Sequence, residues 1–360
     1  MKVFCMSQTP TTGFVLAHEG LLACTPVAVS SVLKDVLRSR KEINILLSRA
    51  FSRRVPDSYL RDHCLSCTMP GRKTRSLVFL HTLREYGGAS DSETISNIIF
   101  AIECSHAASV LVDDLLDSDE IRHGELSVQR RWSNSKTVLF AHYLSASALS
   151  AVHFDEVLAD NLLQAYKTMT VGEMYDVLLP DGGWTEMGYS DLVAQKTFPL
   201  FEFSLFAAAR LSILEAEETR KLRNVGRSLG RLYQLSNDYY DWQVSNLPKR
   251  HLPGSSWPIT FSLPLATYLE RYGVSSLRLD LNRRLLSYEE WEYLLHKIWT
   301  ADVDHHCRME IRQASDRVLS ESLLLPKGLR QVLYGMVQLL NDGDFWYHNY
   351  ERDEPVSVGP

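Results

Sequence analysis

Apolar residues recur at helical spacing along most of the 360-residue chain, whereas the alternating pattern of strands is scarce. Gly and Pro residues that would break helices fall between these apolar segments. No internal repeat, low-complexity run or linker divides the chain. We therefore predict one large all-α domain over residues 26–350, with flexible tails at 1–25 and 351–360. The clearest helical segments are 91–117, 136–178, 189–213, 216–242 and 287–300.

Charge and composition exclude several classes of protein. The net charge of −6 argues against a nucleic-acid surface, which would need a basic stripe. The N-terminal segment lacks the apolar core of a signal peptide, and no window approaches the roughly 18 apolar residues of a membrane span. Six scattered cysteines in so long a chain indicate reduced thiols. We expect a soluble, cytoplasmic protein.

Two short motifs resemble metal sites but have no partners nearby. Cys64 and Cys67 form a CxxC without a second pair at zinc-finger spacing. The run Asp304–Cys307 contains two histidines, yet nothing close in sequence completes a ligand set. We interpret both as structural.

The first acidic motif ends the apolar segment 99–116. Asp113 and Asp117 are one helical turn apart, so both carboxylates share a face at the end of an otherwise apolar helix. An unpaired pair of carboxylates is costly there, because like charges repel and desolvation adds to the cost. A divalent cation relieves both effects, and carboxylate oxygens suit Mg²⁺.

A second motif ends another apolar helix about a hundred residues later. Asn237 and Asp241 are again one turn apart. A single motif of this kind is typical of a solvated helix face. Two such motifs predict a pair of carboxylate-bearing helix ends that face each other across a helical cavity.

Six motifs follow one another along the chain: Pro70–Arg75, Ser105–Asp114, Asp117 with Arg122, His123 and Gly124, Gly172 with Glu173, Lys196 with Thr197, and Tyr233–Asp238. In this order, over a match from about Leu46 to Pro264, they resemble GGKxxR, the helix into the first aspartate-rich motif, D…RRG, GQ, KT and FQxxDD of the trans-isoprenyl diphosphate synthase family. This resemblance implies an all-α bundle around a central substrate cavity, and a Mg²⁺-dependent prenyltransferase of isoprenoid biosynthesis.

The resemblance also implies roles for individual residues. Metal ligands would be Asp113, Asp117, Asn237 and Asp241, holding three Mg²⁺ ions once diphosphate is bound, with Asp114 and Asp238 as outer-shell or secondary ligands. Lys196 and Gln234 would act beside Asp113, Asp117 and Asp241 in ionising the allylic diphosphate. The residues expected to contact the substrates and their diphosphates are Arg72, Arg75, His106, Arg122, His123, Lys196, Thr197 and Lys249.

Four positions depart from the family pattern, mostly on the side of the acceptor. His123 replaces an arginine and is only partly charged near neutral pH. Asn237 brings an amide in place of a carboxylate, and Glu173 an acid in place of an amide. Ile259-Thr260 stands where the family has GK. We infer that ionisation of the donor is kept while the nucleophile differs.

The acceptor is left open by these departures. Family members with an Asn-opened second motif include enzymes that prenylate an indole-containing acceptor and others that cyclise their substrate. Retention of Arg72, Arg75 and His106 favours transfer to an acceptor that carries a phosphate, such as an indole-type phosphate. A class I terpene cyclase, a conventional geranylgeranyl diphosphate synthase and a non-catalytic partner subunit are the alternatives.

Two further expectations concern the donor and the assembly. Small residues at Ala108 and Ser109, one turn before the first aspartate, would leave the tunnel floor open for a C15 or C20 donor, farnesyl or geranylgeranyl diphosphate, unless Phe140 closes it instead. The family commonly forms homodimers through helices, so we expect a homodimer.

Overall fold

The fold is described from a computed structural model that defines residues 26–88, 91–122, 124–178, 188–243, 245–246, 256–277 and 285–343. These residues form α-helices with one short β-hairpin, so the predicted all-α fold is confirmed. The predicted tails, 1–25 and 351–360, lie outside the described residues. The helices are α1 (Pro26–Arg54), α2 (Ser58–Thr68), α3 (Thr74–Glu85), α4 (Ser92–Leu116), α5 (Val128–Arg131), α6 (Asn134–Val152), α7 (Glu156–Leu178), α8 (Tyr189–Lys196), α9 (Phe198–Leu211), α10 (Ala216–Asp241), α11 (Leu263–Tyr272), α12 (Tyr288–Ile298), α13 (Ala301–Ser322) and α14 (Lys327–Leu340), with a 3₁₀ turn at Val274–Leu277 and the hairpin strands β1 (Ile121–Arg122) and β2 (Glu125–Leu126).

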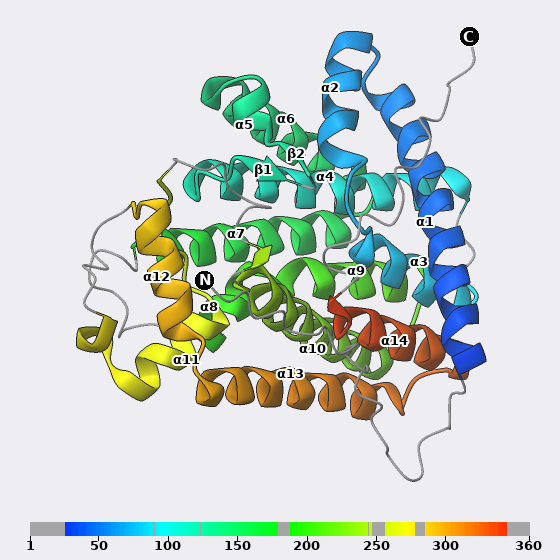
Figure 1. The fold of residues 1–360 in the computed structure, drawn as a ribbon. Helices are drawn as coiled ribbons and strands as arrows, with labels where there is room; N and C mark the ends of the chain where they lie inside the picture. The colour runs from blue at the N-terminus through cyan, green and yellow to red at the C-terminus, as the bar shows by residue number, and fades with distance from the viewer. Residues whose placement is uncertain are drawn as a thin grey trace.

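The long helices form a layered bundle. In Figure 1, α4, α7, α9, α10 and α13 follow one another from top to bottom, while α1 runs down one side and α12 down the other. Helix α4 packs against α6, and α10 packs against both α9 and α13. The first acidic motif therefore lies in the α4 layer and the second in the α10 layer, with α9 packed against both helices.

Helix α9 is mostly apolar and lies between two hydrophobic clusters. Its Phe201 and Leu205 belong to the cluster formed mainly by α10–α14, and its Phe203 and Phe206 belong to the cluster formed mainly by α1–α7. All four side chains are buried. A helix buried against both clusters cannot rotate without exposing apolar surface, so α9 fixes the spacing of its neighbours.

Helix α10 approaches α9 unusually closely at Gly226. A Cβ atom added there would lie 2.9 Å from the Cα of Glu202 and 3.0 Å from the carbonyl oxygen of Phe201. Both are backbone atoms, which cannot move aside as a side chain can. A glycine at position 226 is thus required for α10, which carries the second motif, to pack this closely against α9.

Helix α4 is the one helix in the described part of the chain that is long and apolar enough to cross a membrane. This amends our expectation that no window approaches a membrane span. However, 72% of the most apolar 18-residue stretch of this helix is buried inside the bundle. That burial is typical of a core helix.

One cysteine of each motif that was interpreted as structural is buried in the bundle. Cys64 is fully buried in α2, and desolvation raises the pKa of its thiol to about 12. Cys307 is likewise buried in α13, while Asp304 on the same helix accepts a hydrogen bond from the Tyr239 hydroxyl at 2.7 Å. Within the described ranges, no group of three or more His, Cys, Asp or Glu residues is arranged to hold a metal ion.

Candidate active site

Three aspartates of the first motif lie at the end of α4, and they face different surroundings. Asp113 is about 30% exposed and Asp117, the C-cap of α4, is half-buried, so both carboxylates are accessible. Asp114 points inward and is 1% exposed. It accepts a hydrogen bond from Nε of Arg122 at 2.8 Å, yet desolvation still raises the pKa of its carboxyl to about 6. Asp114 is therefore enclosed by protein groups, whereas Asp113 and Asp117 are accessible to a ligand.

The loop that follows α4 is tied to Arg122 on β1. Besides Asp114, the Arg122 guanidinium lies 3.1 Å from Asp119 and 3.6 Å from Asp113. The side-chain amide of Gln129 on α5 donates to the backbone carbonyls of Asp114 and Asp119, both at 2.7 Å. Arg122, which we expected to bind diphosphate, is thus already paired with three carboxylates.

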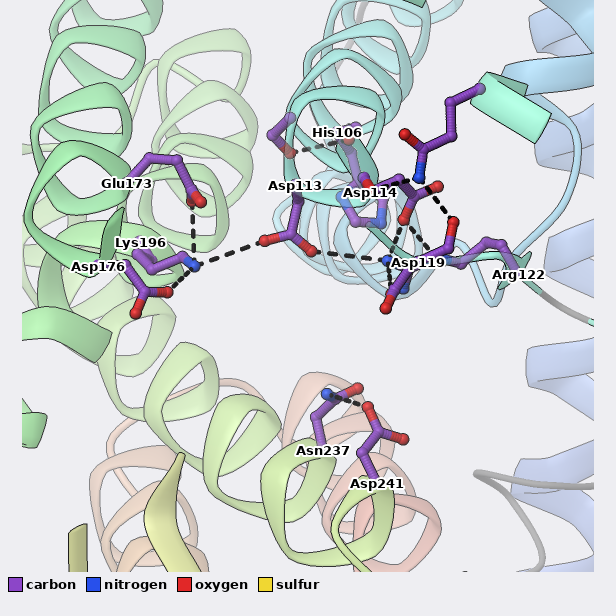
Figure 2. Close-up of polar contacts among 12 residues, drawn as sticks. His106, Asp113, Asp114, Asp119, Arg122, Glu173, Asp176, Lys196, Asn237 and Asp241 are labelled. Atoms are coloured by element: carbon purple, nitrogen blue, oxygen red, sulfur yellow. Dashed lines mark hydrogen bonds and ion pairs between the residues drawn. The ribbon is translucent and has the colours of Figure 1, made fainter. Parts of the chain in front are cut away.

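Lys196, at the C-terminal end of α8, is the second cation of the site. Its Nζ lies 2.5 Å from Asp176, 3.0 Å from Glu173 and 3.5 Å from Asp113. These carboxylates come from α7 and α4, so one ammonium links three helices, as Figure 2 shows. The pKa of Lys196 is well above its ordinary value because the nearby carboxylates outweigh the effect of burial.

A glycine allows α8 to approach α7 at this point. A Cβ atom added to Gly172 would lie 2.9 Å from the backbone nitrogen of Lys196 and 2.9 Å from the Cβ of Gln195. The next residue, Glu173, is half-buried, and burial raises the pKa of its carboxyl to about 7 in spite of the Lys196 ammonium. Gly172 therefore permits α7 and α8 to pack closely, and Glu173 places a carboxylate beside Lys196 at this contact.

The second motif occupies the end of α10. Nδ2 of Asn237 donates a hydrogen bond to Oδ2 of Asp241 at 2.7 Å. In Figure 2 both side chains rise from α10 on the side that faces Asp113 and Arg122. The two motifs that the sequence singled out therefore lie on helix ends that face one another.

Asp238, between those two residues, points away from them into the core. Its carboxylate accepts hydrogen bonds from the Tyr189 hydroxyl at 2.5 Å, Nε2 of Gln234 at 2.7 Å and the backbone N–H of Leu263 at 3.0 Å. Burial raises the pKa of Asp238 to about 7. Asp238 thus joins α8, α10 and α11, and of the two roles expected for it, outer-shell or secondary ligand, this inward position is compatible with the outer-shell one.

The structure brings Gln234 and Thr197 together. Oγ1 of Thr197 donates to Oε1 of Gln234 at 2.7 Å. Through Gln234, this contact extends to Asp238. The amide is therefore fixed in orientation before any ligand enters.

The site is rich in negative charge. Six carboxylates around the end of α4 and the α7–α8 contact face two cationic side chains. Burial and the neighbouring carboxylates raise the pKa of Asp117 well above its ordinary value. Such a set of oxygen donors fits Mg²⁺, which binds through one or two carboxylates together with substrate phosphates rather than in an all-protein cage. The carboxylates are Asp113, Asp114, Asp117, Asp119, Glu173 and Asp176, and the cations are Lys196 and Arg122.

The residues expected to bind an acceptor diphosphate differ in their burial and in their neighbours. Arg72 is half-buried and lines a small apolar hollow with Met336 and Leu339 of α14. Arg75 is only 8% exposed and contacts His106, with Nη1 of the arginine 3.3 Å from Nε2 of the histidine. The Arg75 guanidinium is thus largely enclosed by protein groups, and its contact with a substrate stays a prediction.

The positions proposed to control chain length are also distinct. Ala108 is buried, whereas Ser109 is half-buried on the same face of α4 as Asp113, and its hydroxyl donates to the carbonyl of His106 at 2.8 Å. Phe140 stacks on His63 at 5.7 Å and lies 5.0 Å from Trp132, in an aromatic cluster of α2, α5 and α6. His123 and Lys249 lie outside the described residues.

Asp119 and Asp176 were not singled out from the sequence. Asp119 belongs to the acidic run that begins at Asp113, and Asp176 lies one turn after Glu173. The signal that could have identified Asp176 is its one-turn spacing from Glu173, which places both carboxylates on the same face of the helix.

Comparison with known proteins points to one family. A polyprenyl synthetase family profile matches residues 58–249. Geranylfarnesyl diphosphate synthase of Methanosarcina mazei is 28% identical over 177 residues, 49% of this chain and 59% of that protein. Octaprenyl diphosphate synthase of Escherichia coli is 26% identical over 181 residues, 48% of this chain and 54% of that protein. The chain thus spans little more than half the length of these curated relatives.

Solved structures show the same fold. A polyprenyl synthase of Caulobacter crescentus, complexed with calcium and isoprenyl diphosphate, superposes with a TM-score of 0.74 at 18% identity, covering 87% of this chain and 97% of that one. Geranylgeranyl pyrophosphate synthetase of Pyrococcus horikoshii gives 0.71 at 18% identity, covering 86% and 99%. Since the profile matches more than half of the sequence and the fold agrees, this chain belongs to the polyprenyl synthetase family.

Proposed function

We propose that this protein is a Mg²⁺-dependent prenyltransferase of isoprenoid biosynthesis that ionises a long allylic diphosphate and transfers the prenyl group to an acceptor. The observation that carries the proposal is that Asp113, at the end of α4, faces Asn237 and Asp241, at the end of α10, beside Lys196 and Arg122. Asp117 is the C-cap of α4, one turn after Asp113. Similarity to diphosphate synthases supports the reaction class.

In this proposal Asp113, Asp117 and Asp241 hold Mg²⁺, and Asn237 offers its amide oxygen. Bound Mg²⁺ would neutralise the negative charge that develops on the departing pyrophosphate. Lys196 and Arg122, which both lie beside Asp113, would pair with the same diphosphate. Each contact then strengthens as the leaving group gains charge, which is how electrostatic catalysis lowers a barrier.

The bond changes balance without a further reagent. The bond between C1 of the donor and the diphosphate oxygen breaks, and its electron pair leaves on pyrophosphate. C1 then bonds to a nucleophilic carbon of the acceptor, which afterwards loses one proton to the released pyrophosphate. Gln234, fixed between Thr197 and Asp238, places its amide dipole beside the developing allylic cation.

The donor we propose is farnesyl or geranylgeranyl diphosphate, because Ser109 leaves only a small side chain one turn below Asp113. The acceptor we propose is a small molecule other than isopentenyl diphosphate, such as an indole-type phosphate. Chain elongation with isopentenyl diphosphate is the second candidate, and it is supported by the similarity to geranylfarnesyl and octaprenyl diphosphate synthases.

One incubation series tests these proposals. Purified protein receives Mg²⁺ and a C10, C15 or C20 donor, each alone, with isopentenyl diphosphate, or with an indole-type phosphate. We expect pyrophosphate release and a prenylated acceptor in the incubations that contain the indole-type phosphate. Asp113→Asn should slow this by at least about 100-fold, as should removal of Mg²⁺ with EDTA, because both remove stabilisation of the leaving group. A hydrocarbon from donor alone would indicate a cyclase, and no pyrophosphate release under any condition would refute the proposed function.

We also propose that the protein is a homodimer through α6 and α7. These helices expose large apolar side chains, a feature that marks protein interfaces when the side chains are contiguous. Leu139→Glu should convert the dimer to monomers in light scattering, whereas Leu324→Glu, at an exposed leucine after α13, should leave it intact. The exposed residues are Val138, Leu139, Phe154, Val157, Leu163, Val171, Met174 and Tyr175.

A further inference from the structure

Two tyrosines occupy the middle of the second motif, Asn237–Asp241, and both reach elements that are distant in sequence. The Tyr239 hydroxyl donates a hydrogen bond to Oδ1 of Asp304 on α13 at 2.7 Å. The Tyr240 hydroxyl donates to the backbone carbonyl oxygen of Asn341, the C-cap of α14, at 2.8 Å. Consecutive side chains of a helix point about 100° apart, so these two tyrosines hold the end of α10 from two directions.

The contact between Tyr239 and Asp304 belongs to a closed set of three. Oδ2 of Asp304 accepts a hydrogen bond from Nε of Arg308, one turn further along α13, at 2.9 Å. The guanidinium carbon of Arg308 lies 5.4 Å from the centroid of the Tyr239 ring, within the range of a cation–π contact. Asp304 is the first residue of the run 304–307 that was interpreted as structural, and its carboxylate therefore has a specific partner in the second motif.

A tryptophan binds the same helix end from a third element. Nε1 of Trp299, which follows α12, donates to the backbone carbonyl oxygen of Trp242, the C-cap of α10, at 2.6 Å. The Trp299 ring meets the Tyr239 ring edge-on, with centroids 5.4 Å apart. The last carbonyl groups of a helix have no partner within the helix, so helix ends fray. Asp241 is the last residue of α10, and its position therefore depends on contacts from outside the helix.

Metal binding is sensitive to such fraying, because binding groups have to be held within about 0.5 Å of their productive geometry. Asn237 and Asp241 lie one turn apart in the last turn of α10, and Tyr239 lies between them with only 6% of its surface exposed. We propose that Tyr239, held by Asp304, is a positioning residue that fixes the last turn of α10 for divalent-ion binding by the second motif. This inference rests on the proposed function, to which it adds a requirement for α13.

The test measures metal binding rather than turnover. Binding of an unreactive thio analogue of farnesyl diphosphate to the full chain is measured calorimetrically over a series of Mg²⁺ concentrations. The proteins are wild type, Tyr239→Phe, Asp304→Ala, Asp304→Asn and the double variant Tyr239→Phe/Asp304→Ala. Tyr86→Phe is the matched control, because the Tyr86 hydroxyl also donates to a carboxylate, that of Glu218, but in the first turn of α10. Hydrogen exchange of the metal-free proteins reports on the last turn of α10 directly.

Tyr239→Phe and Asp304→Ala should each raise the half-saturating Mg²⁺ concentration about tenfold, the lower end of the range for losing a hydrogen bond to a charged group. Both should also speed amide exchange in the last turn of α10. The double variant should be no worse than either single variant, since all three lack the same contact. Asp304→Asn should stay within about threefold of wild type, because its amide oxygen still accepts from the tyrosine hydroxyl. Tyr86→Phe should leave the Mg²⁺ requirement unchanged, whatever its effect on the melting temperature.

The inference is overturned if Tyr239→Phe keeps the wild-type Mg²⁺ requirement, or if Tyr86→Phe raises that requirement equally. It is also overturned if Asp304→Asn loses as much as Asp304→Ala, or if the two single effects multiply in the double variant. Wild-type protein that binds no thio analogue at any Mg²⁺ concentration would refute the proposed function together with this inference. Failure of the inference alone is therefore recognised by Mg²⁺-dependent binding that does not respond to the loss of the Tyr239 hydroxyl.

Discussion

Replacing Glu173 by glutamine should stabilise the folded protein at alkaline pH. Burial raises the pKa of this carboxyl from an ordinary 4.5 to about 7, even with Lys196 at 3.0 Å. A raised pKa means that the folded state resists ionisation, so stability is fully present below pH 4.5 and is lost as pH rises through 7. At 1.36 kcal/mol per pKa unit, the charged carboxylate costs the folded state roughly 3 kcal/mol at pH 8.

Glutamine stays neutral at every pH and avoids this cost. Glu173→Gln should therefore raise the melting temperature by about 5 °C at pH 8, and by about half of that near pH 5.5. Thermal unfolding by circular dichroism measures both values, with Glu292→Gln, an exposed glutamate on α12, as the control that should show no such trend. A gain that is absent at pH 8, or that grows on acidification, would refute the reasoning.

The remaining predictions concern the tunnel and the α7–α8 contact. Ser109→Phe should lower kcat/KM for a C20 donor relative to a C10 donor by about tenfold or more, because an added ring would fill the tunnel one turn below Asp113; equal use of both donors would contradict this. Ala108→Phe should instead lower the stability by about 1–3 kcal/mol, measured by urea unfolding, since that position is closely packed. Gly172→Ala should cost about 1–2 kcal/mol and raise the donor KM, because its Cβ would meet backbone beside Lys196. Unchanged KM and melting temperature would show that the contact can relax.

The sequence predicted the elements of this fold better than the directions of its polar side chains. Asp113 and Asp117 were predictable because one-turn spacing at the end of an apolar helix can be recognised without knowing its neighbours. Asp238 was not, because it follows Asn237 in the same motif and turns inward only through its contact with Tyr189, about fifty residues away. The burial of Arg75 likewise depends on α9 and α10, which are distant in sequence. Helical periodicity places residues on a face, whereas tertiary packing decides what that face contacts.

Under the proposed function, the pairing of both cations with carboxylates would link donor binding to metal binding. Asp113 lies 3.5 Å from the Lys196 ammonium and 3.6 Å from the Arg122 guanidinium, so both cations share this carboxylate. A divalent ion on Asp113 would take this carboxylate from both cations, while Lys196 would keep Glu173 and Asp176 and Arg122 would keep Asp114 and Asp119. Without metal, the surplus of carboxylates would repel a diphosphate. With metal, the added positive charge and one carboxylate partner fewer for each cation would favour the anion, which would confine ionisation of a reactive donor to the fully assembled site.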